Sequence, residues 1–295
     1  MMQPHRVGFI GLGMMGTPMV HCLKRAGFEL FLLDADAART SSLVKELGAT
    51  QLDASNAESL DVLITMLPNS QIVESVLLDG DANAWARLLP EGAVIIDMSS
   101  SEPERSRKLG VTLEKLKLGY LDAPVSGGVK KAVAGTLAIL VGGQAPVLDT
   151  CTPVLDAMGE SVLHIGSAGS GHAAKALNNY VSAAGLIATV EALHIAERFG
   201  IDPGVMTDVL NASTGRSNTS ENKVKQFMLS GSFGSGFALQ LMNKDLKIAG
   251  ALSDTLGYPM KLGKTCTTVW DEVSQRATPA TDHTEMYRLL ANEDE

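Results

Sequence analysis

The stretch RVGFIGLGMMG, residues 6–16, determines which fold we expect of this chain. A short apolar run typical of a buried strand leads directly into Gly11, Gly13 and Gly16, where a helical pattern begins. Glycines at this spacing allow a tight turn, a close approach of the backbone to a diphosphate, and close packing of a helix on the strand. The first helical turn adds free N–H groups and the positive end of its dipole. We therefore predict a dinucleotide-binding loop formed by Gly11, Leu12, Gly13, Met14, Met15 and Gly16.

The residue that selects the cofactor is expected at the end of the next apolar run. That run, residues 29–33, leads into Asp34. A carboxylate at this position accepts hydrogen bonds from ribose hydroxyls and repels a 2′-phosphate. Asp36 competes for this role, and Asp34 could instead be an ordinary residue of the turn. No arginine that could bind a 2′-phosphate follows Asp34 directly, since Arg39 is five residues on, so we predict NAD rather than NADP as the cofactor.

Composition excludes several classes of function. The chain has 295 residues and a formal net charge of -9, which argues against sequence-independent binding to nucleic acid. Its longest apolar stretch, residues 180–190, is shorter than the roughly 20 residues that cross a bilayer. The cysteines Cys22, Cys151 and Cys266 and the histidines are dispersed, so we expect no metal site, no disulfide and a cytoplasmic location.

The pattern of apolar runs predicts two domains. Up to about residue 165, short β-branched runs without polar alternation alternate with helical patterns, which is typical of a mostly parallel sheet covered by helices. From about residue 168 the strand signal stops, and residues 171–199 have the pattern of one long helix. Further helical patterns follow, one of them over about residues 219–230. We therefore predict an α/β Rossmann-type domain over residues 1–165. An all-α C-terminal domain is expected over residues 166–295, beginning with the long connecting helix.

A second unusual stretch is GSGHAAKALNNYV, residues 169–181. On a helix, Lys175 shares one face with Asn178 and Asn179, because positions i, i+3 and i+4 lie together. The uncharged neighbours argue against a solvated face, which usually mixes charges of both signs. A lysine near a helix start with locally bonded asparagines is the structural alternative. The pattern favours residues that face a pocket and take part in chemistry.

Taken together, these stretches resemble the β-hydroxyacid dehydrogenase family, which includes 3-hydroxyisobutyrate dehydrogenases and tartronate semialdehyde reductases. The resemblance covers nearly the whole chain and has the order of the family. Its motifs are GFIGLGMMG (8–16), MLPNS (66–70), IDMSSSEP (96–103), DAPVSGG (122–128), GSGHAAKALNN (169–179) and KDLKIA (244–249).

The resemblance implies a role for each motif. Lys175 corresponds to the catalytic lysine, and the substrate is bound by Ser126, Gly127, Gly128 and Asn179. Besides the glycine loop and Asp34, the cofactor is contacted by Leu67, Pro68, Ser100, Phe237 and Lys244. Ser99 is the alternative to Ser100 for the contact with the cofactor, and a serine at either position could also cap the helix that follows.

The activity implied by the resemblance is that of an NAD(P)-dependent oxidoreductase. It interconverts a short 3-hydroxy acid with its semialdehyde or keto acid, with a lysine as acid and base. The family also implies a C-terminal domain like that of 6-phosphogluconate dehydrogenase and a homo-oligomer, a dimer or a tetramer. The alternatives are a non-catalytic dinucleotide-binding or scaffold protein on the same fold, or a reductase of related carbonyl or imine substrates.

The resemblance leaves the roles of two basic residues, Lys131 and Arg216, open. Many members have glycine where this chain has Lys131, so the rim of the DAPVSGG loop is altered. Arg216 lies in residues 211–223, a segment that varies with substrate in the family. It could hold a second anionic group of the substrate or form an ion pair on the surface.

Overall fold

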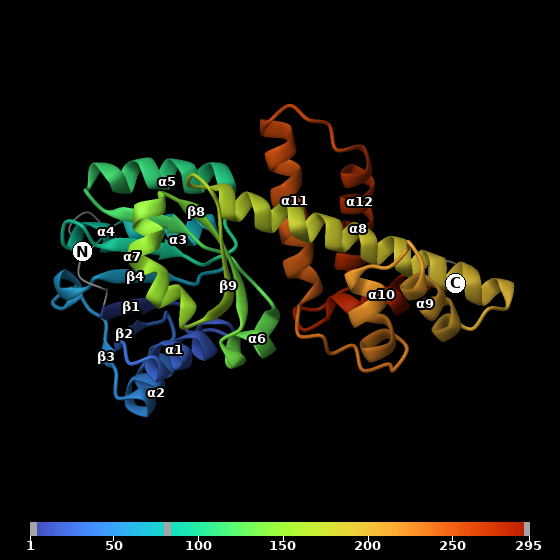
Figure 1. Ribbon diagram of the computed structural model, residues 1–295, viewed down its shortest axis with the longest axis horizontal. Helices are drawn as coiled ribbons and strands as arrows, with labels where there is room; N and C mark the ends of the chain where they lie inside the picture. The colour runs from blue at the N-terminus through green and yellow to red at the C-terminus, as the bar shows by residue number, and fades with distance from the viewer. Residues whose placement is uncertain (1–4, 80–83, 292–295) are drawn as a thin grey trace. The chain divides into compact units, whose positions relative to one another are not determined.

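The computed structural model describes residues 5–79 and 84–291. The chain divides into two compact units within helix α8 (Ser170–Phe199), the first ending at Lys175 and the second starting at Ala176 (Figure 1). The domain limits predicted from the sequence pattern, residues 1–165 and 166–295, stay a prediction.

The first unit is built on a mostly parallel sheet, as predicted. Its strand order is β3-β2-β1-β4-β5-β6-β8-β7, and β9 pairs with β8. The parallel part is made of β1 (Arg6–Ile10), β2 (Glu29–Leu33), β3 (Thr50–Gln51), β4 (Val62–Thr65), β5 (Val94–Asp97) and β6 (Gly119–Asp122). The remainder is β7 (Val125–Ser126), β8 (Leu137–Gly143) and β9 (Gly159–Gly166), with β8 antiparallel to both β6 and β7.

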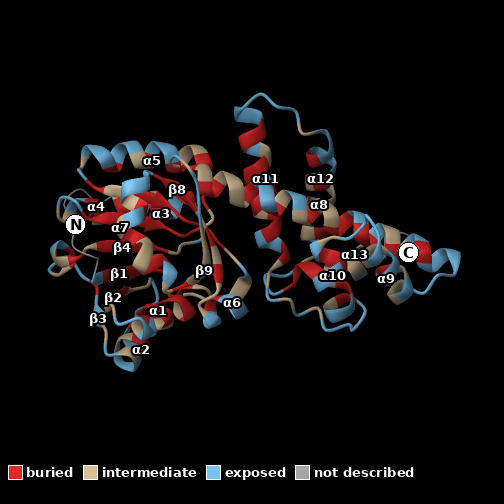
Figure 2. Cartoon of the chain, viewed as in Figure 1, coloured by how far each residue is buried: buried red, intermediate tan, exposed pale blue. Residues whose placement is uncertain are grey.

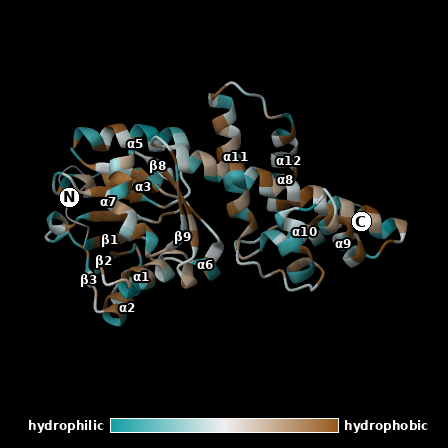
Figure 3. Ribbon diagram, viewed as in Figure 1, coloured by the Kyte–Doolittle hydropathy of each residue, from teal (hydrophilic) through white to brown (hydrophobic). Residues whose placement is uncertain are grey.

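Helices cover both faces of this sheet. Because successive side chains of a strand point to opposite faces, each central strand contributes to two buried clusters. Ile64 and Ile96 belong to one buried cluster with residues of α1 and α7, whereas Leu63 and Ile95 belong to another with residues of α3 and α5. Most of the length of the central strands is coloured as buried in Figure 2 and as hydrophobic in Figure 3. The helices of the first unit are α1 (Gly16–Arg25), α2 (Ala37–Leu47), η1 (Ala57–Ser59), α3 (Ser70–Leu78), α4 (Trp85–Leu88), α5 (Pro103–Lys115), α6 (Gly128–Ala134) and α7 (Ala145–Asp156).

The order of the strands brings the predicted cofactor residues of the first unit to one edge of its sheet. Strand β1 lies between β2 and β4. The chain adds β2 and β3 on one side of β1 and then β4, β5 and β6 on the other side, so the strand order changes direction at β1. In open α/β sheets ligands bind at such a switch point, beyond the carboxyl ends of the strands. The loops after β2, β1, β4 and β5 are therefore neighbours at this edge.

The second unit is helical, as predicted for the C-terminal part. Its core surrounds the fully buried Trp270 and includes Ala183 and Leu186 of α8. The remaining elements are α9 (Pro203–Ala212), α10 (Asn218–Asn222), the π-helix η3 (Val224–Met228), α11 (Leu239–Thr255), α12 (Lys261–Gln275), the 3₁₀-helix η4 (His283–Glu285) and α13 (Met286–Ala291). Where the sequence suggested one helix over residues 219–230, the structure has α10 and η3, which separate at Lys223.

Within residues 5–79 and 84–291, no helix combines sufficient length with sufficient apolar character to cross a membrane.

Candidate functional site

The glycine loop after β1 has an open centre between two crowded positions. Gly11 has φ +102°, and a side chain there would collide with the Met66 carbonyl. A side chain at Gly16 would collide with the Gly11 carbonyl oxygen. At Gly13, by contrast, nothing lies within 4 Å of the place a Cβ would occupy. Gly11 and Gly16 are thus required by packing, and Gly13 leaves the backbone accessible to a ligand such as a diphosphate.

Asp34 is hydrogen-bonded to this loop. Its Oδ2 accepts a hydrogen bond from the Leu12 N–H at 2.6 Å, and its Oδ1 accepts one from the Asp36 N–H at 2.9 Å. Arg39 Nη1 lies 3.4 Å from Oδ1. The carboxylate of Asp36 instead accepts hydrogen bonds from the N–H groups of Ala38 and Arg39 at the start of α2. Asp36 therefore caps a helix, and Asp34 is the carboxylate held against the glycine loop.

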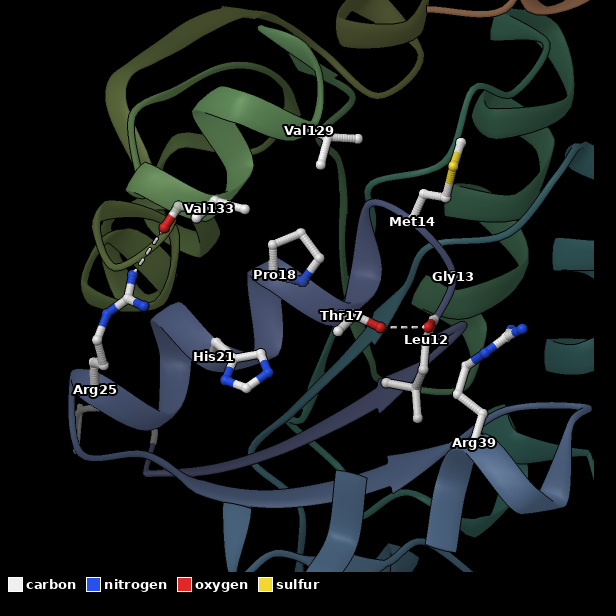
Figure 4. Close-up of a pocket in the computed structure, with 10 residues that line it drawn as sticks. All are labelled: Leu12, Gly13, Met14, Thr17, Pro18, His21, Arg25, Arg39, Val129 and Val133. Carbon is white, nitrogen blue, oxygen red and sulfur yellow. Dashed lines mark hydrogen bonds between the residues drawn. The ribbon is translucent and has the colours of Figure 1, made fainter. Parts of the chain in front are cut away.

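A groove of about 680 Å³ begins at this loop and follows α1 (Figure 4). Gly13 and Arg39 lie at one end, and Arg25, which donates a hydrogen bond to the Val133 carbonyl at 3.2 Å, lies at the other. Its volume falls in the usual range for small-molecule pockets. Its lining is Leu12, Gly13, Met14, Thr17, Pro18, His21, Arg25, Arg39, Val129 and Val133. Each end thus carries an arginine, of which Arg39 is already paired with Asp34 and Asp36.

The loops after β4 and β5 are joined by a serine. The buried Ser99 hydroxyl accepts a hydrogen bond from the Leu67 N–H at 2.8 Å, and the Ser99 N–H donates to Asp97 Oδ1 at 3.1 Å. Ser100 is less buried than Ser99. The N-cap residue of α5 is Glu102, so neither serine occupies that position. Ser99 thus links the two loops, and Ser100 is the serine with an accessible side.

A buried polar network holds the first turn of α8. Asp122, at the end of β6, accepts hydrogen bonds from the Gly169 N–H at 2.7 Å and the His172 N–H at 2.9 Å. The His172 ring bonds to the Ser99 carbonyl at 3.0 Å and the Ser106 hydroxyl at 2.8 Å. Burial raises the pKa of the Asp122 carboxyl, and the charge of His172 opposes this rise. The network connects the loop after β5 to the helix turn that precedes Lys175.

Asp122 and His172 belong to this network, although the sequence assigned neither of them a role in the site. Asp122 lies in the DAPVSGG stretch, and a buried strand that ends in aspartate is the signal that could have drawn attention to it. Lys175 follows His172 by one helical turn and is partly buried. The first unit thus fixes the start of α8 through the buried side chains of Asp122 and His172.

The loop after β7 has the backbone that its glycines permit. Gly127 has φ +134° and Gly128 has φ +67°, both in the region that favours glycine. A Cβ at Gly127 would lie 2.6 Å from Lys131 Cδ, so the aliphatic part of that lysine packs across the glycine. Lys131 is exposed on α6. Its side chain therefore forms one rim of the loop that also contains Ser126.

In the second unit, Asn179 is buried and fixed by an acid. Its Nδ2 donates a hydrogen bond to Asp245 Oδ2 at 2.6 Å, and its Oδ1 accepts one from Asn178 Nδ2 at 3.1 Å. An amide nitrogen carries two hydrogens, so one N–H of Asn179 is left for another acceptor. Asp245 and Lys244 are neighbours on α11. Asn178 is exposed, so the two asparagines of the motif have different surroundings.

Phe237 and Arg216 also lie in the second unit. The Phe237 ring meets the His283 ring edge to face at 5.7 Å, and the Phe237 carbonyl accepts the His283 N–H at 2.9 Å. Arg216 is 60% exposed and its Nη2 lies 2.9 Å from Glu221 Oε1. Of the alternatives open for Arg216, the structure has the surface ion pair.

Among residues 5–79 and 84–291, no group of three or more histidine, cysteine, aspartate and glutamate side chains is placed to hold a metal ion.

Two family models together match almost the whole chain. Residues 6–166 match the NAD binding domain of 6-phosphogluconate dehydrogenase. Residues 169–290 match a domain described as NAD-binding of NADP-dependent 3-hydroxyisobutyrate dehydrogenase. The prediction that the chain binds NAD(P) is confirmed by these matches.

Individual relatives agree with the family models. The chain is 34% identical to 2-(hydroxymethyl)glutarate dehydrogenase of Eubacterium barkeri over 267 residues, covering 90% of this chain and 88% of that one. It is 34% identical to mitochondrial 3-hydroxyisobutyrate dehydrogenase of Rattus norvegicus over 98% of this chain and 88% of that one. An NAD-dependent L-serine dehydrogenase of Pseudomonas aeruginosa is 36% identical over 83% of this chain and 84% of that one.

Solved structures show the same fold. Mycobacterium tuberculosis 3-hydroxyisobutyrate dehydrogenase, determined with L-serine, has a TM-score of 0.90 and 30% identity, covering 98% of this chain and 99% of that one. An imine reductase from Myxococcus stipitatus has a TM-score of 0.66 at 19% identity over 98% of this chain and 100% of that one, a likeness of fold alone.

Proposed function

The chain belongs to the β-hydroxyacid dehydrogenase family, and from that premise we propose that it oxidises a 3-hydroxy acid with a primary hydroxyl to its semialdehyde, using NAD. The observation that carries the proposal is the pairing of two features on one chain. The first is a glycine loop with an open Gly13 and a carboxylate at Asp34. The second is a partly buried Lys175 one turn before the fixed amide of Asn179.

The substrates named for the relatives share one chemical unit. 3-Hydroxyisobutyrate, L-serine and 2-(hydroxymethyl)glutarate each carry a carboxylate and a CH₂OH group on the same carbon. They differ in the third substituent, which is a methyl, an ammonium or a carboxyethyl group. We infer that this chain acts on the shared unit, and that the third substituent is selected by residues outside it.

The proposed chemistry separates a hydride from a proton. Oxidation of the alcohol removes a hydride from its carbon and a proton from its oxygen, and bound NAD supplies the acceptor for the hydride. The neutral amine of Lys175 takes the hydroxyl proton, and in the reverse direction its ammonium returns the proton to the aldehyde oxygen. The remaining N–H of Asn179 orients the substrate by a hydrogen bond.

The other proposed roles concern binding of the substrate carboxylate and of the cofactor. In the first unit, Ser126 and the backbone of Gly127 and Gly128 hold the substrate carboxylate, since glycines permit N–H groups to converge on an anion. Asp34 binds the ribose hydroxyls of the cofactor and repels a 2′-phosphate. The further cofactor contacts that we propose are Gly11, Leu12, Gly13, Met14, Met15, Gly16, Leu67, Pro68, Ser100, Phe237 and Lys244.

The test is the appearance of reduced nicotinamide absorbance with a panel of acids. 3-Hydroxyisobutyrate, L-serine and 2-(hydroxymethyl)glutarate are compared with lactate and 3-hydroxybutyrate, whose alcohols are secondary. We expect NAD reduction with at least one member of the first group and much slower reduction with the second. Binding of NAD without turnover of any acid in the panel would contradict the proposal and favour a non-catalytic role.

A further inference from the structure

Lys223 is a cation of the second unit that the proposed chemistry does not use. It lies at the junction of α10 and η3, and its Nζ is 3.5 Å from the Ser182 hydroxyl oxygen on α8. Val224, the next residue, belongs to the same buried cluster as Ala183 and Leu186 of α8. The segment is therefore packed against α8, and Lys223 is directed at that helix.

Several other cations of the second unit are paired with carboxylates, whereas Lys223 is not. Lys225 Nζ lies 2.6 Å from Asp208 Oδ1, Lys247 Nζ lies 2.7 Å from Asp271 Oδ1, and Arg216 pairs with Glu221. Within residues 5–79 and 84–291, no carboxylate oxygen lies within 4.0 Å of the Lys223 ammonium. A serine hydroxyl at 3.5 Å is a weak partner for a full charge.

Desolvation makes this lack of an anion costly. Burial lowers the pKa of Lys223 to about 8, and the negative charge of Asp282 offsets only part of the shift. Asp282 itself accepts hydrogen bonds from the Ser235 hydroxyl and the N–H groups of Gly236 and Thr284, so its carboxylate is committed elsewhere. Charges withdrawn from water are usually paired, and an unpaired one facing functional residues indicates a ligand site.

The face of α8 that Lys223 meets is the face that carries the proposed substrate residues. Ser182 follows Asn179 by three positions, and Asn179 follows Lys175 by four, so these side chains share one stripe of the helix. The axial rise from Asn179 to Ser182 is about 4.5 Å. The ammonium thus lies roughly one helical turn beyond the amide that is proposed to orient the substrate.

We propose that Lys223, with Ser182, forms a subsite for a second anionic group of the substrate, so that the preferred substrate is a hydroxydicarboxylic acid. This subsite rests on the proposed function, which supplies the reacting CH₂OH group. It adds that the third substituent of the substrate carries a carboxylate. The sequence offered Arg216 of the same segment, residues 211–223, for a second anionic group, but Arg216 forms a surface pair.

The first test compares two substrates that differ in this substituent. The ratio of kcat/KM for 2-(hydroxymethyl)glutarate to kcat/KM for 3-hydroxyisobutyrate is measured with the full chain at saturating NAD. Lys223→Met is expected to lower this ratio by about tenfold or more, because a hydrogen bond between charged groups is lost. Lys225→Met removes a lysine that is paired at the surface and is the matched control, with an unchanged ratio. A ratio that Lys223→Met leaves unchanged overturns the subsite.

The second test does not depend on turnover. Binding of glutarate to the NAD-saturated chain is measured by calorimetry in the parent, in Lys223→Met and in Lys225→Met. We expect binding to weaken about tenfold in Lys223→Met alone. Equal affinity in all three, or no glutarate binding to the parent, overturns the subsite even if the dehydrogenase activity is found. Conversely, selective loss in Lys223→Met supports it even if no alcohol is oxidised. Should Lys223→Met fail to fold, Lys223→Gln serves in both tests.

Discussion

At the scale of single residues, Asp34 and Asp36 show how neighbouring carboxylates acquire different functions. Asp36 accepts hydrogen bonds from the first N–H groups of α2, whereas Asp34 accepts one from the glycine loop and also meets Arg39. A 2′-phosphate near Asp34 would add a charge of the same sign. Arg39, at present shared between the two aspartates, is the group that could bind such a phosphate.

We therefore expect Asp34→Asn to shift the preference from NAD toward NADP. The substitution removes the repulsion and frees Arg39 of one partner, so the ratio of kcat/KM for the two cofactors should change by about tenfold or more. Steady-state kinetics with each cofactor at a fixed hydroxy acid provides the measurement. An unchanged ratio would mean that another group recognises the ribose.

Residue-scale prediction from sequence succeeded where a backbone requirement selects the residue type. Gly11 and Gly16 are demanded by the collisions that any side chain would cause, and their spacing is visible in the sequence. The isolation of Lys223 could not be predicted, because it depends on which carboxylates fold near it. The same holds for His172, whose ring partners come from the distant Ser99 and Ser106.

At the scale of elements, Asp282 holds the segment that precedes α11. It accepts hydrogen bonds from the N–H groups of Gly236 and Phe237 and, at the start of η4, from the N–H of Thr284. Burial raises its pKa, but the hydrogen bonds from His283, Thr284 and Ser235 lower it more, so the pKa lies below the ordinary value. Asp282 thus joins the approach to α11 with the beginning of η4.

Asp282→Ala is expected to destabilise the fold by about 3 kcal/mol, because buried N–H groups lose their acceptor. The sign of the pH effect follows from the lowered pKa. The stabilisation is fully present above the unfolded pKa of about 4 and is lost as pH falls toward the folded pKa. Urea denaturation at pH 7 and pH 3 measures both effects. The parent and the variant should differ less at pH 3, and an equal difference at both values would contradict this role.

Element prediction was accurate where apolar runs are long and ends are marked. The long helix was expected over residues 171–199 and is observed as Ser170–Phe199. The segment 219–230 was less predictable, because the change from α10 to η3 at Lys223 depends on packing against the rest of the unit. Strands β3 and β7 are only Thr50–Gln51 and Val125–Ser126, too short to leave a periodic signal.

At the scale of the whole molecule, helix α8 exposes an apolar stripe. Val181 and Ile195 are 68% and 69% exposed, and Leu177 and Phe199 extend the stripe at a spacing of four residues from each. The interval from Val181 to Ile195 is close to a whole number of helical turns, so these side chains share one face over about 33 Å. Apolar surface of this extent marks an interaction site, and we propose that a second copy of the chain covers it.

The mass in solution tests this proposal. Light scattering after size exclusion should give a multiple of the mass of one chain for the parent. Val181→Glu combined with Ile195→Glu places charges in the stripe and should shift the mass toward that of one chain, with circular dichroism unchanged. A parent that is monomeric at micromolar concentration would contradict the proposal.

The measurement that tests the central claim most directly is the turnover number of Lys175→Ala beside its affinity for reduced NAD. The account predicts that kcat for the hydroxy acid falls by about 10²–10⁴, because the acid and base for the substrate oxygen is removed. Affinity for reduced NAD, followed by its fluorescence, should remain that of the parent. Lys117→Ala, which removes an exposed lysine paired with Glu91, is the control and should keep both values. A kcat for Lys175→Ala equal to that of the parent would contradict the account.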